Sequence, residues 1–355
     1  MKTSTLELQE KTTEKHLSPS EIMKIGMGFW PSKVLLTAVQ YGLFTQLAQQ
    51  PRSLKEIKNM FGWNCSDRHA SDFLDTLFAL RFLQREGIGS LAVYSNAEET
   101  DLFLDKNKAT YIGGILEMAN NRLYPFWANL SDGLTTGKAQ NEIRNGGENL
   151  FEAIYGSPEK LKEFIKAMSG VSVGNFNVFS NRFDFTQYKT LCDIGGSGAI
   201  LSLQVASHQP HMSCTSFDLP PVEPIAQENI SHFGLNDRVK TVSGDFFKDP
   251  FPKADIITMS LILHDWNEEN KRFLIKKAYD ALPAGGAFVV IENIIDDQRS
   301  QNVFGLTMSL NMLIETGEGF DFTLSDFSGW AKQIGFNKID LLPLTGPTSA
   351  AIAYK

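Results

Sequence analysis

The sequence has few of the features that secreted, metal-binding and membrane proteins require. It holds 3 cysteines in 355 residues, and Cys65, Cys192 and Cys214 form no CxxC pair, so neither a disulfide framework nor a zinc site is indicated. No window reaches the roughly 18 apolar residues that span a bilayer. The polar N-terminus has no apolar signal segment. We therefore predict a cytoplasmic protein with no metal and no membrane partner.

The charge balance argues against nucleic acid as a partner. The formal net charge is -8, and an acidic chain repels phosphate backbones. A hydrophobic content of 42% and a charged content of 21% are ordinary for a globular chain with a sizeable core. This length predicts two or three domains.

The first half of the sequence is predicted to be helical. Apolar residues recur at helical spacing over 22–42, and Ser53 with Glu56 forms a capping-box pattern before the next helix. Another helix follows Ser66, and the stretch 84–95 is typical of a hairpin. Helix, helix, helix, hairpin is the winged-helix pattern, which often binds DNA.

The candidate recognition helix is too acidic for that use. It carries Asp67, Asp72 and Asp75 beside only Arg68 and His69. We therefore favour a structural or dimerising role for this region over DNA binding.

The second half alternates short apolar runs with helical segments. Such alternation predicts a doubly wound parallel α/β sheet, closed by a final antiparallel edge hairpin. The predicted strands lie within 189–196, 212–220, 238–247, 254–263, 284–295, 338–344 and 350–355.

The ends of the first three predicted strands carry groups suited to a nucleoside cofactor. Glycines follow Asp193 at the first, Asp218 ends the second, and Asp245-Phe246 ends the third. In an open α/β sheet, ligands bind outside these carboxyl ends. The acids suit ribose hydroxyls and an adenine amino group, and the aromatic ring can cover the adenine. Because the glycine loop lacks the G-x-G-x-x-G pattern that cradles a pyrophosphate, the pattern favours S-adenosylmethionine (SAM) over NAD.

With these residues in view, nearly the whole chain resembles the class I O-methyltransferases of the plant caffeic-acid and hydroxyindole type. The most specific match is Leu263-His264-Asp265-Trp266, together with Ala284-Gly285-Gly286 before a strand that ends in Glu292. The resemblance implies a Rossmann-like SAM-binding domain, a helical dimerisation domain and a homodimer. It also implies that His264 is the general base, oriented by Glu292.

Three departures from the family pattern stand out. Ser197 and Ala199 occupy places where the family's loop has glycine. The family's K-E-R-T segment corresponds here to 320–323, where Asp321 would replace a glutamate beside the base. Ser260 replaces a lysine before the histidine.

The resemblance and the strand ends together define the expected site. The catalytic residues are His264, Asp265, Glu292 and Asp321. The cofactor residues are Asp193, Gly195, Gly196, Asp218, Leu219, Gly244, Asp245, Phe246 and Ser260. The acceptor pocket draws on Trp30, Arg122, Tyr124, Phe126, Phe164, Met168, Met308 and Met312. We expect a lead-in at 1–20, a winged-helix-like dimerisation domain at 21–110, a helical linker and pocket region at 111–185, and the catalytic domain at 186–355.

Three functions remain open from the sequence. The first is methylation of a phenolic, hydroxyindole or polyketide-like hydroxyl. The second is S-methylation of a small methylthio-hydroxy acid, as in dimethylsulfoniopropionate formation, for which Arg122 could bind the substrate carboxylate and no base would be needed. The third is a regulator that binds SAM without catalysis, against which His264 and Glu292 argue.

Overall fold

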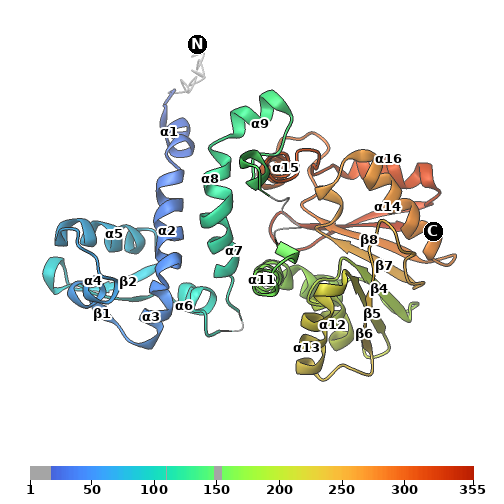
Figure 1. Ribbon diagram of the computed structural model, residues 1–355, viewed down its shortest axis with the longest axis horizontal. Helices are drawn as coiled ribbons and strands as arrows, with labels where there is room; N and C mark the ends of the chain where they lie inside the picture. Colours follow the sequence, from blue (N-terminus) through green and yellow to red (C-terminus); the bar gives the residue numbers. More distant parts are fainter. Residues whose placement is uncertain (1–16, 109, 148–153) are drawn as a thin grey trace, which may run out of the picture. The chain divides into compact units, whose positions relative to one another are not determined.

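The computed structural model describes residues 17–108, 110–147 and 154–355. The chain divides into two compact units, Met1–Ala97 and Glu98–Lys355, which are described separately (Figure 1). Most of the predicted lead-in at 1–20 lies outside the described residues. The boundary between the two units, after Ala97, lies before residue 110, where the dimerisation domain was predicted to end. The four predicted domain ranges stay predictions. Within the described ranges, no helix is long and apolar enough to cross a membrane.

The first unit contains short helices and a small antiparallel sheet. Its strands lie in the order β1-β3-β2. The elements are α1 (Ser20–Gly26), α2 (Phe29–Tyr41), α3 (Leu43–Gln49), β1 (Arg52–Ser53), α4 (Leu54–Phe61), α5 (Asp67–Ala79), β2 (Leu83–Glu86), η1 (Gly89–Leu91) and β3 (Val93–Asn96).

Local capping explains where two of these helices begin. The Ser53 side chain accepts a hydrogen bond from the backbone N–H of Glu56, and the Glu56 carboxylate accepts one from the Ser53 backbone N–H, which is a complete capping box. Ser66 caps α5 by accepting a hydrogen bond from the backbone N–H of His69, without the reciprocal bond of a capping box. The predicted helix starts and the hairpin are thus confirmed, while the winged-helix interpretation stays a prediction.

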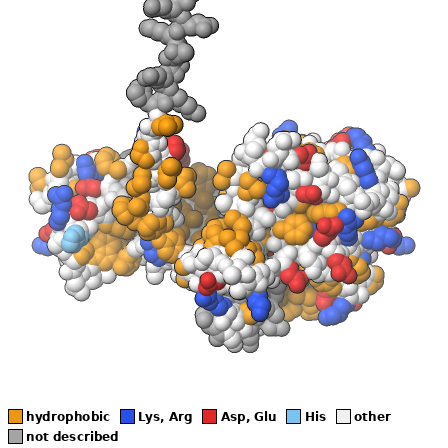
Figure 2. Space-filling model, turned by 90° about the horizontal axis from the view of Figure 1, so that it is seen from above, with side chains coloured by type: hydrophobic (Ala, Val, Ile, Leu, Met, Phe, Trp, Pro, Cys, Tyr) orange, Lys and Arg blue, Asp and Glu red, His pale blue; other side chains and the backbone are white. Residues whose placement is uncertain are grey.

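Hydrophobic side chains lie exposed along α1 and the start of α2. Ile22, Ile25, Phe29 and Trp30 are half or more exposed, and Figure 2 shows hydrophobic side chains gathered over this part of the chain. A contiguous apolar surface of this kind marks an association surface more often than a free one.

The second unit begins with helices that precede the large sheet. They are α6 (Glu98–Leu104), α7 (Gly113–Met118), the π-helix η2 (Ala119–Leu123), α8 (Tyr124–Trp127), α9 (Leu130–Thr136), η3 (Glu142–Asn145) and α11 (Pro158–Arg182). The helix α11 packs against both α7 and α12 (Ile200–His208).

A seven-stranded sheet follows, with strands in the order β6-β5-β4-β7-β8-β10-β9. The strands β4 to β8 are parallel, and β10 is antiparallel to both β8 and β9. The predicted hairpin is confirmed, with β9 at the edge and β10 inserted beside β8. The strands are β4 (Thr190–Ile194), β5 (Ser213–Asp218), β6 (Val239–Ser243), β7 (Ile256–Ser260), β8 (Ala287–Glu292), β9 (Lys338–Pro343) and β10 (Ser349–Tyr354).

Helices cover both faces of this sheet (Figure 1). The crossover segments are α12 (Ile200–His208), η4 (Pro220–Val222), α13 (Glu223–Phe233), η5 (Leu263–Asp265), α14 (Glu268–Ala281), α15 (Val303–Glu315) and α16 (Leu324–Ile334). Along β8, Val289 and Ile291 belong to one core and Phe288 and Val290 to the other. Successive side chains of a strand point to opposite faces, so a strand covered on both faces must be apolar throughout.

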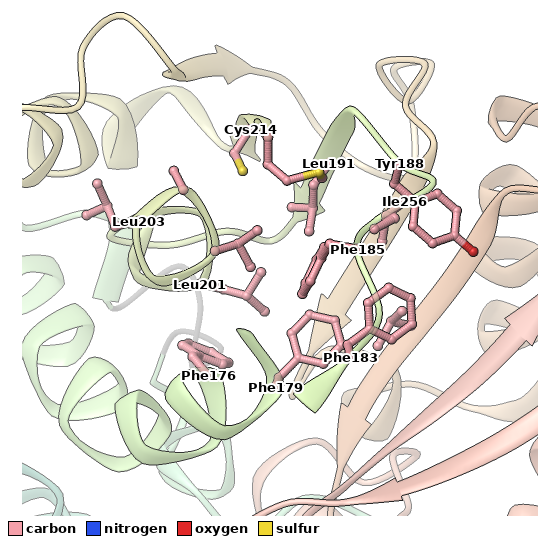
Figure 3. Packing of buried hydrophobic residues seen from close by; sticks show 14 of the residues in the cluster. Phe176, Phe179, Phe183, Phe185, Tyr188, Leu191, Leu201, Leu203, Cys214 and Ile256 are labelled. Carbon is pink, nitrogen blue, oxygen red and sulfur yellow. The ribbon is translucent and has the colours of Figure 1, made fainter. Parts of the chain in front are cut away.

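The core on the α11–α12 face is rich in aromatic rings. Figure 3 shows Phe179, Phe183 and Phe185 packed together, with ring centroids 4.9 to 5.5 Å apart. These rings hold the end of α11 against β4, the strand that leads into the glycine loop.

Truncating the buried ring of this cluster will destabilise the catalytic unit. Phe179 is fully buried, so we expect Phe179→Ala to lower the free energy of unfolding by about 3–5 kcal/mol, measured by urea denaturation. Phe233→Ala is the matched control, because that ring is 49% exposed, and its effect should stay below about 1 kcal/mol. Equal effects of the two substitutions would contradict the packing described.

Candidate active site

A cavity of about 290 Å³ opens at the carboxyl ends of β4, β5 and β7. The strand order reverses between β4 and β7, which is where ligands of open α/β sheets bind. All predicted cofactor residues except Gly244 line it: Asp193, Gly195, Gly196, Asp218, Leu219, Asp245, Phe246 and Ser260. At Gly244, a Cβ would lie 2.5 Å from the Phe217 ring, so this glycine serves packing beside the cavity.

The loop after β4 has an unusual backbone. Gly195 has a φ of 70°, and a Cβ there would lie 2.4 Å from Cδ1 of Ile262, so glycine is favoured at this position. Ser197 and Ala199 also have left-handed φ angles, of 50° and 62°. These are the positions where the resembling family has glycine, so the loop keeps the glycine conformation with side chains that strain it.

Two aspartates belong to the cavity wall, Asp193 buried and Asp218 half-buried. Oδ2 of Asp218 accepts a hydrogen bond from the Ser197 backbone N–H at 2.8 Å, and Oδ1 accepts one from Leu219 at 2.7 Å. Asp193 accepts a hydrogen bond from Thr258 at 2.7 Å. Burial raises the pKa of Asp218 to about 6 and that of Asp193 to about 7. A bound group that donates hydrogen bonds or carries positive charge would relieve this cost of burial.

The third strand end is more open to solvent. Asp245 accepts a hydrogen bond from the Phe247 backbone N–H and pairs with Lys248 at 2.9 Å. The hydrogen bond from Lys248 lowers the pKa of Asp245, so this carboxylate is ionised at neutral pH. Phe246 stands beside it with its ring centroid 6.0 Å from that of Trp266, giving the cavity an aromatic wall.

The charge of the cavity wall is of one sign. Among the described residues that line it are Asp193, Asp218, Asp245 and Asp265, with no lysine, arginine or histidine. Such a wall repels phosphates and attracts cations. It fits SAM, which carries a sulfonium and an ammonium group, and it does not fit a dinucleotide.

His264 lies beside this cavity among three carboxylates. Its Nδ1 is 3.6 Å from Oε2 of Glu292 and 3.6 Å from Oδ1 of Asp321, and its Nε2 is 3.6 Å from Oδ1 of Asp265. Asp265 lines the cavity, whereas His264 is buried behind it and does not. The four predicted catalytic residues are thus brought together from η5, the end of β8 and the segment before α16.

Glu292 also holds the backbone of the turn that carries the histidine. Its Oε1 accepts hydrogen bonds from the N–H groups of Ile262, Leu263 and His264 at 3.2, 3.1 and 3.4 Å. One carboxylate oxygen therefore positions the turn while the other faces the imidazole.

The electrostatics of this cluster favour a protonated histidine. Burial opposes the imidazolium, but the charges of the three surrounding carboxylates outweigh it and raise the pKa of His264 to about 10. Burial also raises the pKa of Glu292 and of Asp265. A carboxylate facing Nδ1 favours the tautomer with the proton on Nδ1, which leaves Nε2 free to accept one.

Three of these side chains could approach one metal ion. Ligand atoms of His264, Glu292 and Asp321 all lie within 4.8 Å of one another. The prediction that no metal takes part is untested by this geometry and stays a prediction.

The remaining histidines in the described part of the chain, including His69 and His208, are exposed, as predicted. His16 lies outside the described residues.

Comparison with known proteins gives the family. Residues 127–337 match the model of the O-methyltransferase domain, and residues 23–106 match that of the O-methyltransferase dimerisation domain. The chain belongs to the O-methyltransferase family. The second match agrees with the predicted homodimer and with the exposed apolar surface of α1 and α2.

Relatives of this O-methyltransferase span nearly its whole length. It is 36% identical over 337 residues to the tetracenomycin polyketide synthesis 8-O-methyl transferase of Streptomyces glaucescens, covering 95% of this chain and 97% of the relative. It is 31% identical to the human acetylserotonin O-methyltransferase, covering 92% and 95%.

A solved structure agrees with this assignment. The crystal structure of human N-acetylserotonin methyltransferase in complex with SAM has a TM-score of 0.87 at 28% identity, covering 98% of this chain and 99% of that one. The protein is therefore a SAM-dependent methyltransferase, and its aspartate-lined cavity fits that cofactor.

The predicted acceptor residues of the O-methyltransferase fall into three groups. Phe164 and Met168 on α11 line the cavity. Met308 and Met312 lie on α15, and Tyr124 and Phe126 lie on α8. The helix α15 packs against α8, α9 and η5, so it connects the aromatic helix to the turn with the histidine. Trp30 belongs to the first unit, and its role stays a prediction.

Arg122 has two carboxylate partners of its own. It donates hydrogen bonds to both carboxylate oxygens of Glu142, at 2.7 and 2.9 Å, and to Glu315 at 3.0 Å. Glu315 is buried, and its Oε1 has no hydrogen-bond partner among the described residues. The carboxylates of Glu142 and Glu315 together carry more negative charge than the single positive charge of Arg122, so no positive charge is left over for a substrate.

Sequence reasoning missed several residues of the site. Tyr155 and Trp266 line the cavity, while Glu315 and Lys271 are charged side chains buried near it. Trp266 belongs to the matched L-H-D-W motif and could have been included. The others lie within helices or before them, where no strand end or motif distinguishes them.

Relieving the strained loop will stabilise the O-methyltransferase. Ser197→Gly removes a side chain from a left-handed residue, and we expect the free energy of unfolding to rise by about 0.5–1 kcal/mol, because the relief of strain exceeds the entropy that glycine adds to the unfolded chain. Ser169→Gly, within α11 in the same cavity wall, is the control and should destabilise by about 0.5 kcal/mol. A loss of stability in Ser197→Gly, measured by urea denaturation, would contradict the strain.

The pH dependence of activity will reflect the carboxylates around His264. A base must be neutral, and a raised pKa keeps His264 charged to higher pH. We therefore expect kcat/KM to increase with pH, with an apparent pKa above 6.5. Asp321→Asn removes one negative charge and should lower this apparent pKa. A wild-type apparent pKa at or below 6.5, in a pH series at saturating SAM, would refute this interpretation.

Proposed function

We propose that this O-methyltransferase transfers a methyl group from SAM to an aromatic hydroxyl of a small molecule, with His264 as the general base. The observation that supports this most is the position of His264 between three carboxylates, next to a cavity whose wall suits a cationic cofactor. No other described histidine has this surrounding.

Three residues manage the proton in this proposal. A neutral hydroxyl is a poor nucleophile, so Nε2 of His264 accepts its proton as the oxygen attacks. Glu292 and Asp321, both 3.6 Å from Nδ1, orient the ring and stabilise the imidazolium that forms. SAM supplies a methyl group on a sulfonium, which is already activated for in-line displacement.

The remaining cavity residues bind and align. Asp218 would accept hydrogen bonds from the ribose hydroxyls, and Asp245 would accept one from the adenine amino group. Phe246 would cover the adenine ring, while the close approach at Gly195 lets the backbone contact the cofactor. Holding both reactants in line removes a large part of the entropic barrier to such a displacement.

The polar groups near the acceptor helices argue against a carboxylate substrate. Arg122, the cation that a carboxylate would need, is already paired with Glu142 and Glu315. A carboxylate brought near this cluster would meet excess negative charge. We therefore favour a phenolic, hydroxyindole or polyketide-like acceptor over a methylthio-hydroxy acid.

We also propose that the enzyme acts in the cytoplasm. Cys65, Cys192 and Cys214 are all free thiols, and free thiols are the usual state in a reducing compartment.

A methyl-transfer assay with a mixed acceptor panel tests the proposed function. Labelled SAM is offered with phenols, hydroxyindoles, hydroxylated polycyclic aromatics and methylthio-hydroxy acids, to wild type and His264→Ala side by side. We expect transfer to one or more hydroxyls, reduced about 10²–10⁴-fold in His264→Ala because the proton then has no positioned acceptor.

The control is His208→Ala, an exposed histidine of the same unit, which should leave the rate unchanged. Binding of SAM, measured by calorimetry, should persist in His264→Ala. If His264→Ala still transfers a methyl group to a thioether, the protein is an S-methyltransferase that forms a sulfonium without a base. If wild type binds SAM but transfers a methyl group to no member of the panel, the regulatory function is favoured instead.

A further inference from the structure

Lys271 is a fully buried lysine within the catalytic unit. It lies in the first turns of α14, which packs against the η5 turn that carries His264. Lysine is almost never fully buried without a partner, and the proposed reaction assigns no role to this one.

Its ammonium group is held by a carbonyl and two aromatic rings. Nζ donates a hydrogen bond to the backbone carbonyl of Trp266. It also lies 3.5 Å from the ring centroid of Phe320 and 5.9 Å from that of Phe322. Aromatic faces stabilise a desolvated cation, so the site is built for the charged form.

The two rings flank Asp321, so Lys271 lies near the carboxylates that surround His264. Burial lowers the pKa of Lys271 to about 8, while the charges of Glu292, Asp321 and Asp265 support the ammonium. Glu268, on the same helix, adds a further favourable charge. The lysine is therefore largely protonated at pH 7.

The charge balance of the cluster depends on this lysine. Three carboxylates face His264, and without Lys271 the imidazolium would be their only buried counter-charge among these residues. Charges interact over several ångströms in a weakly screened interior. A second cation close to the same carboxylates makes a proton on the imidazole less favourable.

We propose that the buried ammonium of Lys271, held on the rings of Phe320 and Phe322, offsets the carboxylates around His264 and makes the imidazole easier to deprotonate than the carboxylates alone would allow. Lys271 is thus a positioning residue that acts through His264. This inference rests on the proposed role of His264 as general base.

Three substitutions separate the charge from the hydrogen bond and the packing. Lys271→Met removes the charge and the donor but keeps the volume. Lys271→Gln removes the charge and keeps a donor for the Trp266 carbonyl. Lys271→Arg keeps the charge. Folding is checked by circular dichroism and thermal melting, and all variants are compared at a temperature at which each of them is folded.

The first readout is the titration of His264 itself, in the unliganded full-length protein. Histidine labelled with ¹³C at Cε1 is followed by NMR from pH 5 upward, with the His264 signal assigned by its loss in His264→Ala. We expect the His264 pKa to rise by about one unit in Lys271→Met and Lys271→Gln, and to stay near the wild-type value in Lys271→Arg.

The second readout is the pH profile of kcat/KM with the acceptor that the panel identifies. At pH 7, the methionine and glutamine variants should lose about tenfold in kcat/KM. The gap should close as the pH rises, because the wild-type lysine loses its own proton and the variant imidazole becomes neutral. A merely structural defect would lower the rate at every pH.

Lys277→Met is the matched control. Lys277 lies on the same helix, and its Nζ also donates to backbone carbonyls, those of Phe246 and Asp249, and rests 4.5 Å from the Phe251 ring centroid. Its charged neighbours are Asp245 and Asp249 rather than the acids around His264. Its removal should not move the titration of His264.

Two results would overturn the inference. One is an unchanged His264 pKa in Lys271→Met, and the other is wild-type behaviour of Lys271→Gln, which would assign the role to the hydrogen bond instead. If wild type transfers no methyl group to any acceptor, the proposed function fails instead, while the NMR titration still decides whether Lys271 acts on His264.

Discussion

Oε1 of Glu292 accepts hydrogen bonds from three consecutive backbone N–H groups, those of Ile262, Leu263 and His264. Because Glu292 ends the interior strand β8 and is buried, this one carboxylate connects the sheet to the turn that carries the base. Its other oxygen faces the imidazole at 3.6 Å. The position of the catalytic turn and the charge around the histidine are therefore set by the same side chain.

Buried negative charge is the common property of both halves of the site. Aspartates line the cofactor cavity, and carboxylates surround His264. Two cations nearby, the half-buried Arg122 and the buried Lys271, are each paired with protein acids or aromatic rings. Since the cost of burying these carboxylates falls when a cation approaches, the arrangement favours a cationic methyl donor and a neutral acceptor.

The sequence predicted the sheet and its strand ends well, because the direction of parallel strands brings their carboxyl ends together whatever the side chains do. It did not predict that β10 lies between β8 and β9, since antiparallel partners leave no trace in spacing. The pairing of Arg122 with Glu142 and Glu315 could not be predicted either, because these glutamates come from other segments of the chain. Nothing in the sequence distinguishes Lys271 from the other charged residues of α14, because its burial comes from packing.

The pairing of β10 with β8 bears on how this protein folds as it is made. Ser349 lies opposite Glu292 in the register of the two strands, so β8 has a neighbour on one side only until a much later segment has been synthesised. A central strand with an open edge is prone to wrong pairing. β8 therefore obtains its second neighbour only when β10 is in place, and until then this strand edge is open to wrong pairing.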